Sequence, residues 1–292
     1  MKQAVVISSA RTPLCKSWKG SFNHTHGATL GGAVVQESIK RSNVDPDAIE
    51  DVVFGCAYPE GATGENIARQ IALRAGLPVA VPGMTLNRFC SSGLQAVAMA
   101  SQRIMSGEGE VFTAGGLESI SCVQNEKNTH LNTEPWLELN KPAIYWNMLQ
   151  TAEMVAKRYK IDREQQDEYG VQSQTRASNA QKNGLFSDEI VKIETPMKTI
   201  SPETGDIELK DVAVDQDEGI RPGTTYEGVS NIKPAVEGGV ISAGNASQFS
   251  DGASAQIVTS EVYAEKNGLD VMGAFKGFAV AGCEPDEMGI GP

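Results

Sequence analysis

Short apolar segments with strand character alternate, in the first part of the chain, with segments that have the periodicity of helices. The strand-like runs lie at residues 4–8, 52–54, 84–87 and 111–114. Between them, apolar residues recur every three or four positions, most clearly from Leu94 to Met105, a stretch that Gly107 closes. This alternation is typical of an α/β domain, so we predict a mainly parallel sheet that is buried on both faces.

The alternation stops near Ser119 and returns at Ala255. Between these points we predict two helices, the second of which begins at the capping-box pair Asp162 and Gln165, and a hairpin that residues 189–194 and 207–214 could form. After them we predict a strand at 255–259, a helix at 260–267 and a strand at 272–281. We therefore predict a first domain of residues 1–118 and 241–268, into which residues 119–240 are inserted.

Composition excludes several classes of protein. The 292 residues carry 25 Lys and Arg against 37 Asp and Glu, a formal net charge of −12, so binding to nucleic acid through bulk charge is not expected. Apolar residues make up 40% of the chain, enough for a sizeable core, and no run is long enough to span a membrane. The chain has five cysteines, an odd number at irregular spacing, which indicates free thiols in a reducing compartment. We therefore expect a cytoplasmic protein.

Cys90 is the most informative of these cysteines, because it lies where a predicted strand ends and a strongly periodic helix begins. The positive end of a helix favours a thiolate, and the small residues at 91–93 would let a second group approach the sulfur. The backbone N–H of Cys90 could also donate to a substrate carbonyl oxygen. On the residues alone, a buried structural cysteine is an equally good interpretation.

Two further segments could serve a ligand or could be ordinary turns. Residues 244–253 form a polar, small-residue stretch that could present Ser247 and backbone N–H groups. Residues 115–119 follow a strand and could let two backbones approach closely, although a tight turn between a strand and a helix explains them as well. The histidines, His24, His26 and His130, lack metal-ligand spacing, so neither a metal site nor a histidine base for Cys90 is predicted.

Five segments of the chain resemble, in order and spacing, those of the thiolase family. They are the stretches 87–95 (Asn-Arg-Phe-Cys-Ser-Ser-Gly-Leu-Gln), 115–119 (Gly-Gly-Leu-Glu-Ser), 151–153 (Thr-Ala-Glu), 243–253 (Ala-Gly-Asn-Ala-Ser-Gln-Phe-Ser-Asp-Gly-Ala) and 288–292 (Met-Gly-Ile-Gly-Pro). The opening Ala-Arg-Thr-Pro at 10–13 also fits. The form of the segments around Cys90 and Ser247 is more similar to 3-ketoacyl-CoA thiolases than to the biosynthetic acetoacetyl-CoA type.

The resemblance implies a layered α-β-α-β-α sandwich of two similar α/β halves, with a loop domain inserted in the first. Residues 119–240 would be that loop domain, and residues 269–292 would begin the C-terminal thiolase domain. By the same resemblance, Cys90 is the nucleophile that takes the acyl group, Ser247 contacts the pantetheine part of coenzyme A, and Arg221 lies near its nucleotide end. Asn147 and Met148 fall in the acyl-CoA loop, where Asn147 replaces the histidine of many members.

The reaction implied by the resemblance is thiolytic cleavage of a 3-ketoacyl-CoA by coenzyme A, or the reverse condensation, through an acyl-cysteine intermediate. Acyl-CoA and coenzyme A would be the partners, no cofactor or metal would be needed, and a homodimer or homotetramer is expected. Such an acetyl-CoA C-acyltransferase serves fatty acid metabolism, including β-oxidation. Thiolases continue beyond the match to residue 292 with segments that supply further acid and base groups. We therefore expect a truncated thiolase whose residues 1–292 are inactive alone.

Two alternatives remain on the sequence. A condensing enzyme of the ketoacyl-acyl-carrier-protein synthase type would share the nucleophilic cysteine but would use a carrier protein as partner. A catalytically silent thiolase fragment would only bind coenzyme A or associate with other subunits. The reading frame past residue 292 would decide between them. A Gly-His-Pro segment and a second cysteine would indicate the thiolase, histidines in place of that cysteine would indicate the condensing enzyme, and an immediate stop codon would favour the silent fragment.

Overall fold

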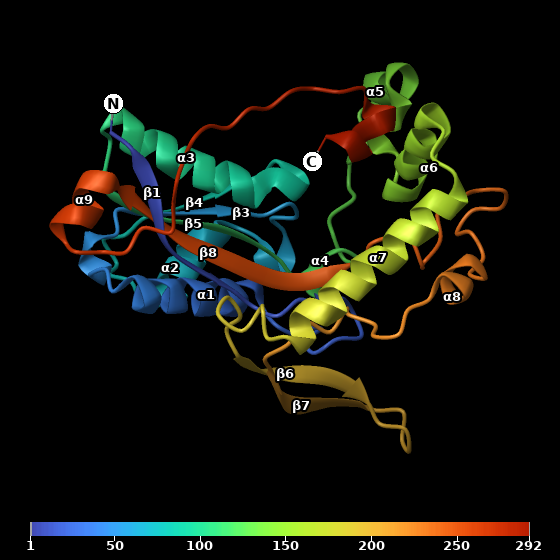
Figure 1. The fold of residues 1–292 in the computed structure, drawn as a ribbon, viewed down its shortest axis with the longest axis horizontal. Coiled ribbons are helices and arrows are strands. Elements are labelled where there is room, and N and C mark those ends of the chain that lie inside the picture. Colours follow the sequence, from blue (N-terminus) through green and yellow to red (C-terminus); the bar gives the residue numbers. More distant parts are fainter. Residues whose placement is uncertain (1, 292) are drawn as a thin grey trace. The chain divides into compact units, whose positions relative to one another are not determined.

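The first part of the chain forms one β-sheet with helices on both of its faces (Figure 1). The structure, a computed structural model, describes residues 2–291. The contacts between residues divide the chain into two compact units. The first unit comprises Met1–Lys127, Ser187–Gly219 and Phe249–Phe278, and the second comprises Asn128–Phe186, Ile220–Gln248 and Ala279–Pro292.

The first unit holds the sheet, a separate hairpin and the helices that cover the sheet. Its strands are β1 (Ala4–Arg11), β2 (Cys15–Lys16), β3 (Asp51–Gly55), β4 (Gly83–Leu86), β5 (Val111–Glu118), the hairpin strands β6 (Ile193–Ile200) and β7 (Ile207–Val214), β8 (Ser250–Ser260) and β9 (Gly273–Ala274). Its helices are α1 (Gly27–Ser42), α2 (Ile67–Arg74), α3 (Ser92–Ser106), α4 (Ile120–Val123) and α9 (Glu261–Lys266).

The sheet confirms the α/β class, but its strands are mixed in direction. The strand order is β4-β3-β5-β8-β1-β9, and β2 also pairs with β8. β3 is parallel to β4 and β5, whereas β8 is antiparallel to both β5 and β1. The prediction of a mainly parallel sheet is therefore wrong for β1, β8 and β9, because β8 returns from far along the chain and enters between β5 and β1 in the opposite direction.

Alternate residues of the strands supply two apolar cores, one on each face of the sheet. Val52 and Phe54 of β3 pack on one face with α1 and α2, whereas Val53 packs on the other face with α3. Figure 1 shows α1 and α2 on one side of the strands and α3 on the other. A strand that is apolar on both faces reads as a continuous hydrophobic run, which is why β3 could be recognised in the sequence.

Several strand boundaries differ from the prediction, among them that of β6, which spans Ile193–Ile200 where the sequence predicted 189–194. β8 begins at Ser250, five residues before the predicted start, because it pairs with β5 as far as Glu118 opposite Gly252 and its first two residues pair with β2. The predicted strand at 272–281 is wrong: only Gly273 and Ala274 form a strand, β9, which pairs with β1. The apolar residues around that short strand stay largely exposed, so no second sheet layer orders them.

The second unit is built mainly from helices. They are α5 (Pro135–Asn140), α6 (Met148–Tyr159), α7 (Arg163–Lys182) and α8 (Tyr226–Ser230), together with 3-10 segments at Pro142–Tyr145 and Pro285–Ile290. The predicted capping box is confirmed at the start of α7, where the Asp162 side chain accepts the N–H of Gln165 and the Gln165 side chain accepts the N–H of Asp162. This pair explains why α7 begins where it does.

The compact units do not follow the predicted domain boundaries. Residues 187–219, which contain the β6–β7 hairpin, belong to the first unit, although the sequence placed them in the insertion 119–240. Residues 241–248 belong to the second unit, although the sequence placed them in the first domain. The division into thiolase domains, with residues 269–292 as the start of a C-terminal domain, stays a prediction.

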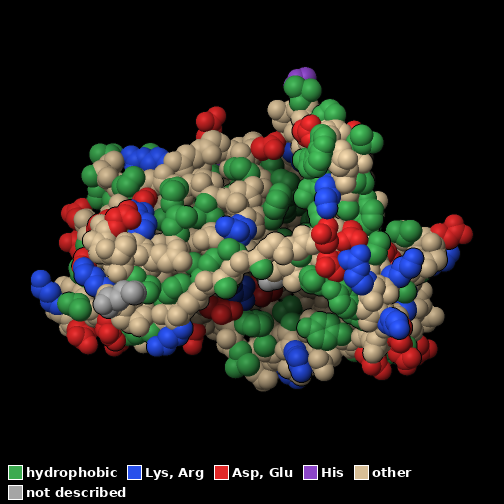
Figure 2. All heavy atoms as spheres, turned by 90° about the horizontal axis from the view of Figure 1, so that it is seen from above, with side chains coloured by type: hydrophobic (Ala, Val, Ile, Leu, Met, Phe, Trp, Pro, Cys, Tyr) green, Lys and Arg blue, Asp and Glu red, His purple; other side chains and the backbone are tan. Residues whose placement is uncertain are grey.

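The charges on the surface and the hydropathy of the helices are those expected from the composition. On the face drawn in Figure 2, Lys and Arg side chains lie scattered among acidic side chains. Within residues 2–291, no helix combines the length and the apolar character that crossing a membrane requires.

Candidate active site

Cys90 lies in a 3-10 turn, Phe89–Ser91, between β4 and α3. The residue is exposed, which argues against the interpretation of Cys90 as a buried structural thiol. The turn contains a strained conformation, because Phe89 has a φ of 45°, in the left-handed region that bulky residues rarely adopt. The structure therefore places Cys90 at the strand-to-helix junction expected from the sequence, in an exposed and strained turn.

Three hydrogen bonds hold this turn. The Phe89 N–H donates to Oδ1 of Asn87 at 2.7 Å. Oγ of Ser92 accepts the Arg88 N–H at 2.8 Å and donates to the Phe89 carbonyl at 2.6 Å. Strain of this kind persists where the surroundings determine the conformation, and it is found most often at functional sites. Asn87 and Ser92 thus impose the backbone conformation that presents Cys90.

The amino end of α3 lies directly against the strands below it. A Cβ on Gly55, the last residue of β3, would lie 2.3 Å from the carbonyl carbon of Ser92. A Cβ on Gly116 of β5 would lie 3.0 Å from Cα of Gly93. The close backbone approach predicted for residues 115–119 is thereby confirmed, although these glycines lie within β5 and not in a turn after it. Glycine at these positions lets the sheet carry the start of α3.

Glu118, the last residue of β5, is a buried carboxyl group close to this junction. It accepts the N–H groups of Ala57 and Tyr58, which follow β3, and it contacts the thiol of Cys56. Burial raises the pKa of Glu118 to about 7, and the hydrogen bonds from Ala57 and Tyr58 only partly oppose that rise. Near neutral pH, Glu118 is therefore a mixture of its neutral and ionised forms.

The raised pKa of Glu118 predicts a pH-dependent stability. Because the folded protein holds this proton more tightly than the unfolded chain, whose pKa is near 4.5, ionisation of Glu118 destabilises the fold progressively as the pH rises from 4.5 to about 7. Glu118→Gln is expected to raise the free energy of unfolding by about 1–3 kcal/mol at pH 8 and to change it little at pH 4.5. Urea unfolding at both pH values measures this, with the exposed Glu265→Gln as control. An equal effect of Glu118→Gln at both pH values would contradict it.

The other cysteines of the first unit are poor nucleophiles. Cys15 and Cys56 are fully buried, and Cys122 is half-buried. Burial raises the pKa of Cys56 to about 12 and also raises the pKa of Cys15 and Cys122. In the second unit, Cys283 is exposed. Cys90 is thus the accessible thiol of the first unit.

Alkylation should follow this order. We expect iodoacetamide near neutral pH to modify Cys90 first and Cys15 and Cys56 at least about 10²-fold more slowly, because only the thiolate reacts and it must be accessible. Cys90 should precede Cys283, since backbone N–H groups at the amino end of α3 favour an anion. Peptide mass mapping over time measures the order. Modification of Cys283 or Cys15 while Cys90 stays unmodified would contradict the expectation.

Ser247 lies in an exposed loop of the second unit that α6 holds in place. The carboxylate of Glu153, on α6, accepts the N–H of Val240 at 2.9 and 3.0 Å and the N–H of Ile241 at 2.9 Å. A carboxylate that accepts several backbone N–H groups fixes a loop strongly. This contact gives a physical reason for the glutamate of the Thr-Ala-Glu segment, which the sequence left without a role.

A second set of contacts fixes the same loop against α7. Nδ2 of Asn245 donates to Oδ1 of Asp167 at 2.8 Å, and Oδ1 of Asn245 accepts the N–H of Ser242 at 2.8 Å. Asp167 is fully buried and pairs with Nε of Arg163 at 2.6 Å. A buried, hydrogen-bonded ion pair keeps one geometry, so the loop presents Ser247 from a fixed frame.

Three further predicted site residues lie in the second unit. Asn147 is the N-cap of α6: its Oδ1 accepts the N–H of Gln150, and the Gln150 side chain accepts the N–H of Asn147, both at 3.0 Å. Met148 is the first residue of α6 and is 53% exposed. Arg221 is exposed, and its N–H donates to the side chain of Gln174, on α7, at 2.8 Å. Asn147 therefore has a structural task whatever else it does.

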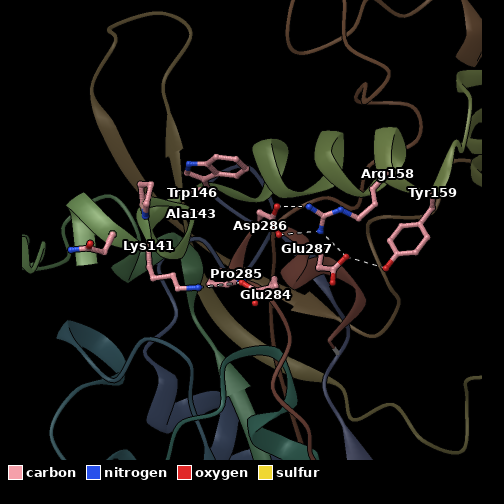
Figure 3. Close-up of a pocket in the computed structure, with 11 residues that line it drawn as sticks. Lys141, Ala143, Trp146, Arg158, Tyr159, Glu284, Pro285, Asp286 and Glu287 are labelled. Carbon is pink, nitrogen blue, oxygen red and sulfur yellow. Dashed lines mark hydrogen bonds and ion pairs between the residues drawn. The ribbon is translucent and has the colours of Figure 1, made fainter. Parts of the chain in front are cut away.

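An open cavity of about 530 Å³ lies in the second unit (Figure 3). Trp146, Arg158 and Tyr159 line it together with the 3-10 segment at 285–290. Nη1 of Arg158 donates to Glu287 at 2.7 Å, and the Tyr159 hydroxyl donates to the same carboxylate at 3.0 Å. The Arg158 guanidinium lowers the pKa of both carboxyl groups that it contacts, Asp286 and Glu287. These ion pairs attach the 3-10 segment Pro285–Ile290 to α6.

The predicted site residues thus divide between the units: Cys90 is in the first, and Ser247, Arg221, Asn147 and Met148 are in the second. Within the second unit, α6 and the loop that it holds bring Asn147, Met148 and Ser247 onto one connected framework. The sequence missed the supporting residues, among them Asn87, Glu118, Glu153 and Asp167. Three of them, Asn87, Glu118 and Glu153, are polar residues inside family segments, and that position is the signal that could have identified them.

Histidines and metal-binding groups add little to this site. His26 caps α1 by accepting the N–H of Ala28 on Nδ1, and His24 and His130 are exposed. Within residues 2–291, no group of three or more His, Cys, Asp or Glu side chains is arranged to hold a metal ion.

Comparison with known proteins agrees with the sequence segments. The family model described as thiolase, N-terminal domain, matches residues 4–262. The chain is 43% identical over 295 residues to a 3-ketoacyl-CoA thiolase of Bacillus subtilis and 37% identical to an acetyl-CoA acetyltransferase of Cupriavidus necator, and it is covered completely in both alignments. The crystal structure of the Bacillus anthracis acetyl-CoA acetyltransferase superposes with a TM-score of 0.84 at 34% identity over the whole chain. The chain spans 74, 75 and 74% of these three proteins, respectively.

Proposed function

Because this chain belongs to the thiolase family, we propose that it transfers acyl groups between a 3-ketoacyl-CoA and coenzyme A, with Cys90 as the acyl carrier. The observation that carries the proposal is the position of Cys90, exposed in a strained turn at the amino end of α3 within a family segment. The relative at 43% identity is named a 3-ketoacyl-CoA thiolase, which favours that substrate class over acetoacetyl-CoA alone.

The chemistry proceeds in two transfers through a covalent intermediate. The Cys90 thiolate attacks the 3-keto carbon, and the bond between C2 and C3 of the substrate then breaks. The electron pair of that bond, with one proton, forms the methyl group of acetyl-CoA, which leaves, while the remaining acyl group stays on Cys90 as a thioester. The sulfur of a second coenzyme A then attacks this thioester, releases Cys90 and departs as a shortened acyl-CoA. The reverse sequence is a condensation.

The first unit supplies two features that suit these steps. Cys90 is exposed and is followed by small residues, which leaves room for a thioester beside the sulfur. The backbone N–H of Cys90 is the proposed donor to the oxygen that becomes negatively charged when the carbonyl is attacked. Such a donor stabilises the tetrahedral intermediate more than it stabilises the ground state.

The second unit supplies the proposed contacts to coenzyme A. Ser247 is exposed on a loop that Glu153 and Asn245 hold, as suits a contact to the pantetheine part. Arg221 is an exposed cation that suits the nucleotide end with its phosphates. Asn147 and Met148 are proposed to contact the acyl-CoA, Met148 through its exposed side chain.

Product analysis tests the proposal. The protein, extended to the length of its relatives, is incubated with coenzyme A and 3-ketoacyl-CoA substrates of increasing chain length, and acyl-CoA products are separated by mass. Appearance of acetyl-CoA together with an acyl-CoA shorter by two carbons is expected. Residues 1–292 alone are assayed beside the extended protein and are expected to form no product. An extended chain that binds coenzyme A but forms neither product would support the silent fragment, and products formed only from a carrier-protein thioester would support the condensing enzyme.

We propose the cytoplasm as location and a homodimer or homotetramer as assembly.

A further inference from the structure

A chain of hydrogen bonds connects Glu118 with the turn that carries Cys90. The Glu118 carboxylate accepts the N–H of Ala57. The carbonyl of the same residue, Ala57, accepts Nδ2 of Asn87 at 2.9 Å. Oδ1 of Asn87 then accepts the N–H of Phe89 at 2.7 Å, directly before Cys90. Glu118 and Asn87 therefore meet at Ala57 from opposite sides.

The place of Ala57 in the fold makes these contacts important. Pairing of β3 with β4 and β5 ends at Gly55, so Ala57 lies beyond the last paired residue of the sheet. The segment that contains it is fixed on one side by the end of β5, through Glu118, and on the other side by the residue after β4, through Asn87. A residue whose backbone N–H and carbonyl are both held by hydrogen bonds is a rigid support for the segments attached to it.

The turn needs such a support because Phe89 is in the left-handed region, with a φ of 45°. A bulky residue keeps this conformation only where its surroundings impose it. Oδ1 of Asn87 imposes it through the Phe89 N–H, but Asn87 can do so only while its own side chain is oriented. The Ala57 carbonyl provides that orientation through Nδ2.

We propose that Glu118 and Asn87, acting through the backbone N–H and the backbone carbonyl of Ala57, are positioning residues for Cys90. This inference rests on the proposed role of Cys90 as acyl carrier and deepens it. The hydrogen bonds at the carboxyl ends of β3 and β5 thereby fix the position of the Cys90 thiol. Glu118 acts as an acceptor, so an uncharged side chain of the same shape can replace it.

The test is the rate of alkylation at Cys90, measured relative to Cys283 in the same molecule. Iodoacetamide reacts with wild type, with Glu118→Gln, Glu118→Leu and Asn87→Ala, with the double variant, and with Glu265→Leu as an exposed control. Peptide mass mapping gives each rate. Cys15, which is fully buried, reports loss of the fold by becoming labelled. If Glu118→Leu exposes Cys15, Glu118→Asp replaces it.

We expect Glu118→Leu and Asn87→Ala each to slow Cys90 relative to Cys283 by about tenfold, because a displaced reactive group loses its favourable surroundings. Glu118→Gln should stay within about twofold of wild type, since its amide oxygen still accepts the Ala57 N–H. The double variant should be no slower than the slower single variant, because both act through the backbone of one residue, Ala57. A merely structural role would not give this pattern of rescue and coupling.

An unchanged ratio of the two rates in Glu118→Leu and Asn87→Ala would overturn the inference, as would effects that multiply in the double variant. Alkylation needs neither substrate nor turnover. A protein that fails to transfer acyl groups therefore contradicts the proposed function without deciding this inference, and the two failures are distinguishable.

Discussion

Replacement of Cys90 by alanine is expected to lower the rate of acyl transfer by about 10⁴-fold or more, because no other group would then accept the acyl chain. Cys90→Ser should be nearly as slow, since a hydroxyl group is far less ionised than a thiol near neutral pH. Initial rates of 3-ketoacyl-CoA cleavage, measured with saturating coenzyme A on the protein extended to the length of its relatives, give both numbers. The matched control is Cys283→Ala, which removes the other exposed thiol and should leave the rate unchanged.

Residual activity separates the alternatives. If Cys90→Ala keeps more than about a tenth of the wild-type rate while Cys283→Ala is strongly impaired, the nucleophile has been assigned to the wrong cysteine. If both variants bind coenzyme A as wild type does, the loss in Cys90→Ala lies in the chemical step. The position of Cys90, outside the loop that carries Ser247, leads us to expect intact binding.

Gly55→Ala is expected to have the second largest effect, on both stability and activity. The added Cβ would lie 2.3 Å from the backbone of Ser92 and 2.5 Å from the backbone of Gly93, so the first turn of α3 must move away from β3. Overpacking of this kind costs about 1–3 kcal/mol of unfolding free energy. A shift of about 1 Å at the reacting group can cost about 10²-fold in rate.

Thermal unfolding and acyl-transfer rates of Gly55→Ala measure these effects. Gly277→Ala is the control, because a Cβ there meets no atom within 4 Å, and it should change stability by less than about 0.5 kcal/mol. Equal stability and activity of both variants would show that α3 does not rest on Gly55 as described.

The sequence predicted the local elements well, because their signals are local. The stripe from Leu94 to Met105 and the closing Gly107, with a φ of 82°, mark α3 in the sequence and in the structure. The direction of β8 could not be predicted, because the same apolar run would serve a parallel or an antiparallel partner. Its antiparallel place between β5 and β1 depends on pairing across more than a hundred residues of chain.

The sequence singled out Cys90, whose role as nucleophile stays a prediction, but it did not single out the residues that support the turn of Cys90. Cys90 carries a local signal, a thiol at the start of a periodic helix. Glu118 and Asn87 matter through Ala57, which lies 61 and 30 positions away along the chain, respectively. Glu153 likewise holds the Ser247 loop across 87 positions. No periodicity or spacing predicts such contacts, although the family segments did contain Asn87, Glu118 and Glu153.

The family resemblance stated from the sequence is confirmed, and with it the acyltransferase function. The roles of Cys90, Ser247, Arg221, Asn147 and Met148 stay predictions. For Asn147, the structure adds a physical task, the capping of α6. Replacing it therefore changes a helix end as well as any ligand contact, so a loss of activity in Asn147→Ala needs a measurement of helix stability beside it.

The most direct test of the account is the detection of the acyl group on Cys90. The protein is mixed with a 3-ketoacyl-CoA in the absence of free coenzyme A, quenched in acid and digested, and the peptide that contains Cys90 is weighed. We predict a mass increase equal to the shortened acyl group on that peptide, absent from Cys90→Ala and removed when coenzyme A is added before quenching. An acyl group on another residue, or a Cys90 peptide of unchanged mass while products accumulate, would contradict the account.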